Sequence, residues 1–221
     1  MKIKKLFKIG LINTIRLNIH YFGFSSLLHP KIIAGRQLQI LKLDGEVKTD
    51  DSVKTGDIQI GISGSAIFDS KYQRSQWKNS GCIHFKGKTL LGYGVRIDNS
   101  ADLYFGKNVH ITANTTIICH KSVKLGDNVL ISWDTLIMDT DFHKIYDVEK
   151  YSGSENLEVG EKEIIIGDNV WIGCRCLLLK GCSIPSGSIV AAGSKITKKF
   201  EQNNSLLCDN KIIRNNVSWE E

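Results

Sequence analysis

The sequence is most constrained by a run of aliphatic residues that recur at every sixth position between residues 164 and 200. The matching positions are Ile166, Ile172, Leu178, Ile184, Val190 and Ile196. An α-helix repeats at about 3.6 residues and a strand at about 2, so neither element generates this period. A hexapeptide period is typical of a parallel β-helix, in which short strands form the flats of a prism around an apolar core. A sandwich of evenly spaced strands is the alternative, and this unbroken series of matches makes it the poorer fit.

A second, longer repeat precedes this run. Its apolar positions advance three times by six residues and then by two, so that one turn takes twenty residues. These positions are Phe85, Leu91, Ile97 and Leu103, then Phe105, Ile111, Ile117 and Val123, then Leu125, Ile131 and Ile137. The period predicts three flats per coil and therefore an all-β helix of triangular cross-section. We expect about five coils between residues 85 and 200 and a less regular start near residue 57.

The repeat also divides the chain. We expect an N-terminal segment at residues 1–56, the β-helix at residues 57–200, and a C-terminal extension at residues 201–221. The N-terminal segment starts with lysines and continues with an amphipathic stretch. We expect this helical or extended segment to pack on the β-helix or on a neighbouring subunit. The alternative is a weak contact with the inner membrane surface through lysine and apolar side chains.

Composition narrows the possible classes of function. The net charge of +6 is mild, and the basic residues are dispersed without a recognised motif, so we expect no nucleic-acid partner. The six cysteines form no C-x-x-C pair and no zinc spacing, which indicates reduced thiols in a cytoplasmic protein without a metal site. No apolar run has membrane-spanning length, and the N-terminus lacks the unbroken apolar stretch of a secretory signal.

One segment, residues 139–163, breaks the register of the repeat. It is polar and charged, and long excursions from a rigid scaffold often carry function. It contains Asp139, Asp141 and His143. A neutral imidazole beside carboxylates is a candidate general base at neutral pH. A surface histidine without a role is the alternative.

The stretches LGDNVLIS, DFH and IIIGDNVWIGCRCLLLKGCSIPSGSIVAAGSKITK resemble the hexapeptide-repeat acyltransferases. The resemblance covers residues 85–200, and the nearer relatives are the maltose and galactoside O-acetyltransferases and the enzymes of capsular and lipopolysaccharide assembly. It implies a left-handed parallel β-helix and a homotrimer with active sites between subunits. It also implies acetyl-CoA as co-substrate without a required metal, and a sugar or glycan hydroxyl as acceptor.

The resemblance also assigns residues. His143 matches the catalytic histidine, with Lys144 in place of the expected proline, and Asp139 or Asp141 would orient the imidazole. Asn114 matches a residue that contacts the acceptor substrate. The positions that match the acyl-CoA site are Trp171, Gly173, Cys174, Ala192, Gly193, Thr197 and Lys198. A structural interpretation is open for several of them, because β-helix corners need small residues and Thr197 and Lys198 could form a solvated face.

We therefore expect an acyl-CoA-dependent O-acyltransferase, most simply an O-acetyltransferase that acts on a sugar or polysaccharide precursor in the cytoplasm. A peripheral position at the inner membrane face is the alternative for its location. Two alternatives stay open. One is a metal enzyme like the γ-type carbonic anhydrases, which would need His110, His120 and His143 to converge on zinc. The other is a β-helix that binds ligands without chemistry.

Overall fold

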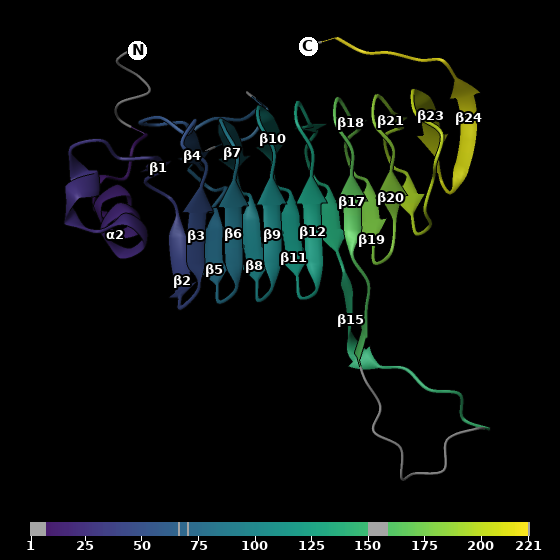
Figure 1. Ribbon diagram of the computed structural model, residues 1–221, viewed down its shortest axis with the longest axis horizontal. Helices are drawn as coiled ribbons and strands as arrows, with labels where there is room; N and C mark the ends of the chain where they lie inside the picture. The colour runs from purple at the N-terminus through teal and green to yellow at the C-terminus, as the bar shows by residue number, and fades with distance from the viewer. Residues whose placement is uncertain (1–7, 66, 70, 150–158, 221) are drawn as a thin grey trace.

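A computed structural model describes residues 8–65, 67–69, 71–149 and 159–220. The chain winds into a left-handed parallel β-helix of triangular cross-section, in which three parallel sheets form the three flats (Figure 1). In the part of the chain that is described, the strands form six successive sets of three, followed by a shorter last turn. The fold predicted from the hexapeptide period is confirmed.

The strands of each flat are as follows. The first sheet contains β1 (Ile32–Ala34), β4 (Ile58–Ile60), β7 (Thr89–Tyr93), β10 (Val109–Ala113), β13 (Leu130–Ile131), β18 (Trp171–Ile172), β21 (Ile189–Val190), β23 (Ser205–Cys208) and β24 (Lys211–Asn215). The second sheet contains β2 (Gln39–Leu43), β5 (Gln76–Asn79), β8 (Arg96–Asn99), β11 (Thr116–Cys119), β14 (Leu136–Met138), β19 (Leu177–Leu179) and β22 (Lys195–Ile196). The third sheet contains β3 (Glu46–Thr49), β6 (Cys82–Phe85), β9 (Asp102–Phe105), β12 (Ser122–Leu125), β17 (Ile164–Ile166) and β20 (Ser183–Ile184).

The repeat positions fill the core. Each aliphatic or aromatic residue predicted to point inward from residue 85 to residue 196 is buried. The strand register follows both periods, because Ile111 pairs with Leu91 in the longer repeat and Ile172 pairs with Val190 in the shorter one. One apolar side chain per flat therefore stacks on its equivalent in the next coil.

One corner of the prism is lined by asparagines in the left-handed backbone region. Asn108, Asn128 and Asn169 have φ values of 55°, 55° and 54°. Their amides form a ladder along the helix axis, since Asn108 donates to Asn128 at 3.1 Å and Asn128 donates to Asn169 at 3.0 Å. Asparagine tolerates this conformation better than most residues, so the recurrent Asn of the GDNV and GKNV motifs is explained by the corner.

The parallel pairing extends beyond the expected range of 57–200 at both ends. At the start, Ile32 pairs with Ile58 in the first sheet, and β2 and β3 join the other two sheets. The early coils carry insertions, so the hexapeptide register is not visible in their sequence. At the end, β23 pairs in parallel with β21, and β24 then pairs with β23 in the antiparallel direction and completes the sheet.

The N-terminal segment contains α2 (Leu11–Phe22) and the 3₁₀ helix η1 (Phe24–Leu27). The helix packs on β1 and buries Leu17. Asn18 lies opposite Ile32: its side-chain amide donates to the Ile32 carbonyl at 2.7 Å, and its side-chain oxygen accepts from the Ile32 N–H at 3.2 Å. Thr14 Oγ1 accepts from the Ala34 N–H at 3.0 Å. The helix thus satisfies the edge of the first strand, and an exposed edge is otherwise prone to pair with another chain.

The outer face of this segment is apolar, with Leu11, Ile12, Phe24 and Leu28 exposed. Within the described part, α2 contacts β1, while residues 1–7 lie outside it. Among the described helices, none is long and apolar enough to cross a membrane. The weak membrane contact stays a prediction.

The register break at residues 139–163 is an excursion from the prism. β15 (Thr140–Lys144) and β16 (Val159–Glu161) pair in the antiparallel direction between β14 and β17. Figure 1 shows this hairpin projecting away from the shaft at the corner between the second and third sheets. Residues 150–158 lie outside the description.

Candidate active site

Asp139 lies at the base of the projecting hairpin and is completely buried. Its carboxylate accepts three backbone N–H groups from the corner of the preceding coil: His120 at 2.8 Å, Lys121 at 2.8 Å and Ser122 at 2.9 Å. Both carboxylate oxygens are therefore engaged with the corner between β11 and β12. This geometry speaks against the expected role of Asp139 in orienting His143.

Asp141 forms an ion pair with Lys180, which follows β19. The pair is partly buried and joins the hairpin to the next coil. Gly160 on β16 leaves the necessary space, because a Cβ there would lie 2.6 Å from an Asp141 carboxylate oxygen and 2.5 Å from Lys180 Nζ. Asp141 thus anchors the hairpin, and its partner is a lysine instead of the expected histidine.

His143 is exposed on β15, near the outer part of the hairpin. The preceding residue, Phe142, has a φ of 60°, and its ring packs edge-on against His120 with ring centroids 5.2 Å apart. The Phe142 ring thus holds the base of the hairpin against the corner between β11 and β12. An exposed imidazole on a projecting hairpin is positioned to meet groups outside its own prism.

Trp171 stands on the outer face of the first sheet and is 36% exposed. Its indole N–H donates to Ser132 Oγ at 3.1 Å, and its ring lies 6.3 Å from that of Trp219. Trp219 in turn donates from Nε1 to the carbonyl of Asn169 at 2.8 Å. The orientation of Trp171 is therefore fixed from two sides.

A groove of about 510 Å³ lies beside Trp219 along the asparagine corner. Its lining includes Asn108, His110, Asn128, Leu130, Asn169 and Trp219. Leu130 is also the register partner of Trp171, so the groove and the exposed indole share one strip of the first sheet. The mixture of apolar and amide groups suits an elongated ligand with polar functions.

Gly173 and Gly193 are glycines for different reasons. A Cβ on Gly173 would lie 2.6 Å from the backbone nitrogen of Ala192, so the close approach of two coils excludes a larger residue. Gly193 has open space around its Cβ position but a φ of 77°, which favours glycine. Its N–H donates to the Cys174 carbonyl at 2.8 Å. Ala192 and Gly193 are both exposed, which leaves their backbone accessible to a ligand.

Thr197 and Lys198 are exposed at the end of the second sheet. The Thr197 N–H donates to the side chain of Asn210 at 2.8 Å, and the Asn210 amide donates back to Thr197 Oγ1 at 2.8 Å. Lys198 Nζ lies 5.3 Å from the centroid of the Phe200 ring. Thr197 is thus hydrogen-bonded to the turn between β23 and β24. This contact agrees with a structural role for Thr197.

Asn114 occupies the corner between the first and second sheets with a φ of 51°. Its side-chain oxygen is buried and, among the described residues, accepts no hydrogen bond. The hydroxyls of Thr112 and Ser63 are likewise buried without partners in the described part of the chain. Unsatisfied buried polar atoms are uncommon in native proteins, and such atoms commonly bind a ligand or an ordered water. This set agrees with a substrate-contacting role for Asn114.

The zinc alternative requires the three histidines to converge. His110 stands on β10 in the first sheet, His120 follows β11, and His143 lies on the projecting hairpin. The described residues contain one group with metal-ligand spacing, and it includes none of these histidines. The structure gives no support to the carbonic-anhydrase-like arrangement.

Three residues that contact Trp171 or Asp141 could not be predicted from the sequence: Ser132, Lys180 and Trp219. Ser132 and Lys180 acquire their roles from register, because they face Trp171 and Asp141 across neighbouring coils. Trp219 lies outside the repeat, so no period could place it. An isolated tryptophan near the end of the chain was the one available signal.

Comparison with known proteins agrees with this architecture. Residues 163–198 match the family described as Bacterial transferase hexapeptide (six repeats). The chain is 32% identical over 103 residues to a galactoside O-acetyltransferase of Escherichia coli (strain K12), an alignment that covers 47% of this chain and 48% of that protein. It is 28% identical over 103 residues to a galactoside O-acetyltransferase of Lactococcus lactis subsp. lactis (strain IL1403), with 46% and 47% covered. The alignments thus span about half the length of these relatives.

A solved structure gives the same fold. The crystal structure of the polySia specific acetyltransferase NeuO superposes with a TM-score of 0.55 at 20% identity, and covers 86% of this chain and 79% of that one. The fold is a left-handed β-helix, and residues 163–198 carry hexapeptide repeats. The resemblance to the hexapeptide-repeat acyltransferases that the sequence indicated is confirmed.

Proposed function

We propose that this protein transfers an acetyl group from acetyl-CoA to a hydroxyl group of a sugar or polysaccharide precursor, with His143 as general base. The observation that carries the proposal is the exposed His143 on a hairpin that interrupts a hexapeptide β-helix. The names of the relatives support acetyl transfer to a galactoside or a polysialic acid in those proteins. A sugar hydroxyl is therefore the acceptor class we assign to this chain.

The separation of His143 from Trp171 supports a trimer with active sites between subunits. In one chain the hairpin leaves the corner between the second and third sheets, whereas β18 with Trp171 lies in the first sheet (Figure 1). The two side chains lie on different sides of one prism. In a homotrimer, the hairpin of one subunit would bring His143 to the Trp171 face of its neighbour.

The donor half of the site would then be the strip around Trp171. The indole would pack on the thioester end of acetyl-CoA, and the exposed backbone of Ala192 and Gly193 would accept the close approach of the pantetheine arm. Cys174 lies at the same corner and is partly exposed. Gly173 keeps the two coils close, so that this strip stays narrow.

The reaction follows from these placements. Neutral His143 would accept the proton of the sugar hydroxyl as its oxygen attacks the thioester carbonyl. The tetrahedral intermediate carries an oxyanion, which backbone N–H groups at a neighbouring corner would stabilise. As the carbon–sulfur bond breaks, the imidazolium returns its proton to the departing thiolate. The products are the acetyl ester and free CoA, with no covalent enzyme intermediate and no metal.

A screen of acceptors tests the proposal. Purified protein is incubated with acetyl-CoA and a panel of nucleotide sugars and simple glycans, and mass spectrometry detects the addition of one acetyl group. We expect acetylation of at least one sugar hydroxyl, at a rate that depends on the amount of protein. A non-catalytic β-helix that only binds ligands would instead be stabilised by acetyl-CoA in thermal unfolding and yield no acetylated product.

A further inference from the structure

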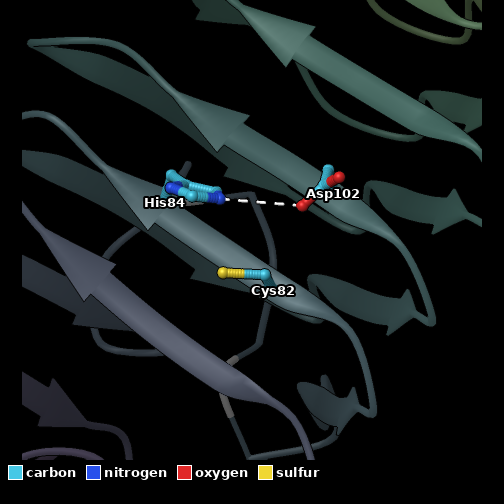
Figure 2. A group of neighbouring side chains, drawn as sticks. All are labelled: Cys82, His84 and Asp102. Atoms are coloured by element: carbon cyan, nitrogen blue, oxygen red, sulfur yellow. Dashed lines mark ion pairs between the residues drawn. The ribbon is translucent and has the colours of Figure 1, made fainter.

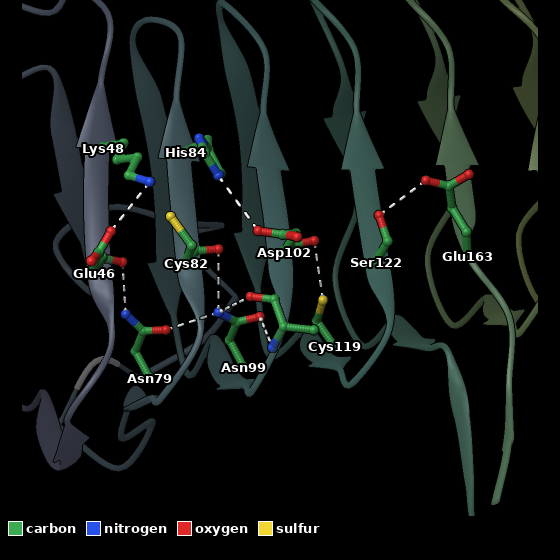
Figure 3. Close-up of polar contacts among 11 residues, drawn as sticks. Glu46, Lys48, Asn79, Cys82, His84, Asn99, Asp102, Cys119, Ser122 and Glu163 are labelled. Atoms are coloured by element: carbon green, nitrogen blue, oxygen red, sulfur yellow. Dashed lines mark hydrogen bonds and ion pairs between the residues drawn. The ribbon is translucent and has the colours of Figure 1, made fainter. Parts of the chain in front are cut away.

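The outer face of the third sheet carries a row of polar and charged side chains along the helix axis (Figure 3). At one end, Lys48 pairs with Glu46 at 3.2 Å. Further along, Lys124 pairs with Glu163 at 2.6 Å, and Ser122 donates to the same carboxylate at 3.0 Å. Both are ordinary ion pairs at the protein surface. The side chains between these two pairs are of a different type, because they include a thiol and an imidazole as well as a carboxylate.

Between the two pairs lie Cys82, His84 and Asp102 (Figure 2). The ligand atoms of the three side chains all lie within 4.8 Å of one another. The distance from His84 Nε2 to Asp102 Oδ1 is 3.7 Å, which is long for a hydrogen bond. Cys82 and His84 are partly exposed, and Asp102 is exposed.

The backbone holds these side chains in a fixed arrangement. Cys82 and Asp102 are direct register partners on β6 and β9, and His84 is the partner of Tyr104. The imidazole stacks on the Tyr104 ring with centroids 4.2 Å apart and planes 10° from parallel. Stacking on a neighbouring strand limits rotation of the imidazole and keeps Nε2 directed to Asp102.

A second layer of hydrogen bonds supports the start of each strand (Figure 3). Asn99 donates to the Asn79 side chain at 2.8 Å and to the Ala101 carbonyl at 3.1 Å, next to the two ligand-bearing strands. Cys119 Sγ donates to the Asp102 carbonyl at 3.4 Å. These contacts fix the backbone from which the Cys82 and Asp102 side chains extend.

We propose that Cys82 Sγ, His84 Nε2 and Asp102 Oδ1 bind one zinc ion on the third sheet, with water in the fourth position. Thiolate, imidazole and carboxylate are the ligands that Zn²⁺ takes in proteins, at roughly 2.0–2.3 Å from the metal. Tetrahedral bonds of that length place ligand atoms roughly 3.5 Å apart. The His84–Asp102 distance of 3.7 Å is close to this value, and the Cys82 sulfur lies within 4.8 Å of both ligand atoms.

The charges near the site fit this assignment. The Cys82 thiolate and the Asp102 carboxylate together neutralise a divalent ion. On one side, Lys48 is the register partner of His84 and pairs with Glu46. On the other side, Tyr104 separates His84 from Lys124, whose Nζ lies 5.7 Å from the Tyr104 ring centroid. Each of the two nearby lysines is thus paired with a carboxylate, Lys48 with Glu46 and Lys124 with Glu163.

The spacing of these ligands matches no zinc-binding motif that can be recognised in the sequence. Cys82 and His84 are two residues apart on one strand, so both side chains lie on its outer face. Asp102 follows twenty residues after Cys82, which is one turn of this β-helix. The site therefore depends on the coil period, and it joins β6 to β9 through the metal.

Cobalt(II) titration of the full-length protein, after chelator treatment, tests this assignment. Co²⁺ bound to a thiolate gives a near-ultraviolet charge-transfer band, and its visible bands report tetrahedral geometry. We expect saturation at one ion per chain, displacement by Zn²⁺, and an increase in the unfolding temperature with Zn²⁺. The variant Cys82→Ser should lose the charge-transfer band and the zinc-dependent increase.

Two further variants preserve the shape of the surface. His84→Phe retains a ring on Tyr104, and Asp102→Asn retains the size of the side chain; each should weaken Zn²⁺ binding at least tenfold. Cys208→Ser is the matched control, because Cys208 is also a partly exposed thiol and should leave the band unchanged. The assignment is overturned if the wild type binds no Co²⁺ at micromolar concentration, or if Cys82→Ser and Cys208→Ser give the same spectrum as the wild type.

Discussion

Asp139 is completely buried and His143 is exposed, although only three residues separate them in the sequence. The Asp139 carboxylate holds the backbone of the preceding corner through the N–H groups of residues 120–122. His143 lies beyond that anchor on the projecting hairpin. The buried carboxylate therefore fixes the place where the hairpin leaves the prism, and the histidine is carried outward from a rigid base.

Asp139→Ala should destabilise the protein. The substitution leaves three partly buried backbone N–H groups without an acceptor, and we expect a loss of about 3 kcal/mol in the free energy of unfolding. Asp139→Asn keeps one acceptor oxygen and should cost less. Urea denaturation measures both values. The control Asp44→Ala removes an exposed carboxylate that pairs with Lys42 and should change stability by less than about 1 kcal/mol. Equal losses at residues 139 and 44 would contradict the anchoring role.

Trp171→Ala should weaken acetyl-CoA binding about tenfold, which corresponds to about 1.4 kcal/mol. The indole is partly exposed, so its removal should leave the fold intact. Isothermal titration calorimetry with acetyl-CoA measures the affinity. Ser132→Ala removes the acceptor that orients the indole and should have a smaller effect of the same sign. Tyr72→Ala, which truncates another exposed aromatic residue, is the control and should bind acetyl-CoA as the wild type does. Unchanged affinity in Trp171→Ala would place the donor elsewhere.

Gly173→Ala and Gly193→Ala should destabilise the protein by different routes. At residue 173 the added methyl group meets the backbone of Ala192, and we expect a loss of about 1–3 kcal/mol from overpacking. At residue 193 the space is open but the φ is positive, so the cost should be about 1 kcal/mol. Chemical denaturation compares the two. A smaller loss at Gly173 than at Gly193 would contradict the close approach of the two coils.

The buried thiol of Cys182 should make the protein less stable at alkaline pH. Burial raises its pKa to about 12, whereas an unfolded chain has a cysteine pKa of about 8.5. The folded state keeps the proton that the unfolded state loses, so the stability contribution is complete below about pH 8.5. It decreases as the pH rises toward about 12, at about 1.4 kcal/mol per pH unit.

Between about pH 9 and 10.5, the free energy of unfolding of Cys182→Ala should therefore decrease less steeply with pH than that of the wild type. Urea denaturation at each pH measures both. Ile184→Val is the control, because it truncates a neighbouring core side chain without removing a thiol. That variant should be less stable than the wild type by a constant amount across the range. Parallel pH curves for the wild type and Cys182→Ala would disprove a thiol contribution.

The regular part of the fold could be predicted from the sequence because its period is a property of the core. Each predicted inward position, from Phe85 to Ile196, is buried as expected. The first coil could not be predicted, because insertions hide its register and Ile32 pairs with Ile58 across an irregular connection. The contact between Asn18 and Ile32 was also invisible, since a polar residue on a helix gives no sign that it completes a strand edge.

The candidate site, like the fold, could be predicted only in part from the sequence. Motif resemblance selected Trp171 and Gly173, whose surroundings in the structure agree with a ligand strip. It grouped Asp139 with His143 because they are close in the sequence. In the structure, the Asp139 carboxylate instead accepts hydrogen bonds from the backbone N–H groups of residues 120–122. Cys82 and Asp102 could not be paired without the coil period and the direction of each side chain. Residues that act through register become visible only when the strands are aligned.

The central claim is that His143 is the general base of acetyl transfer, and the His143→Ala variant tests it most directly. With an acceptor identified by the screen, release of CoA gives kcat/KM for the variant, for the wild type and for the control His29→Ala, which removes another exposed histidine. We predict a loss of about 10²–10⁴ in kcat/KM for His143→Ala. Acetyl-CoA affinity should be unchanged in that variant, and His29→Ala should be fully active. Wild-type kcat/KM in His143→Ala would contradict the assignment of the base.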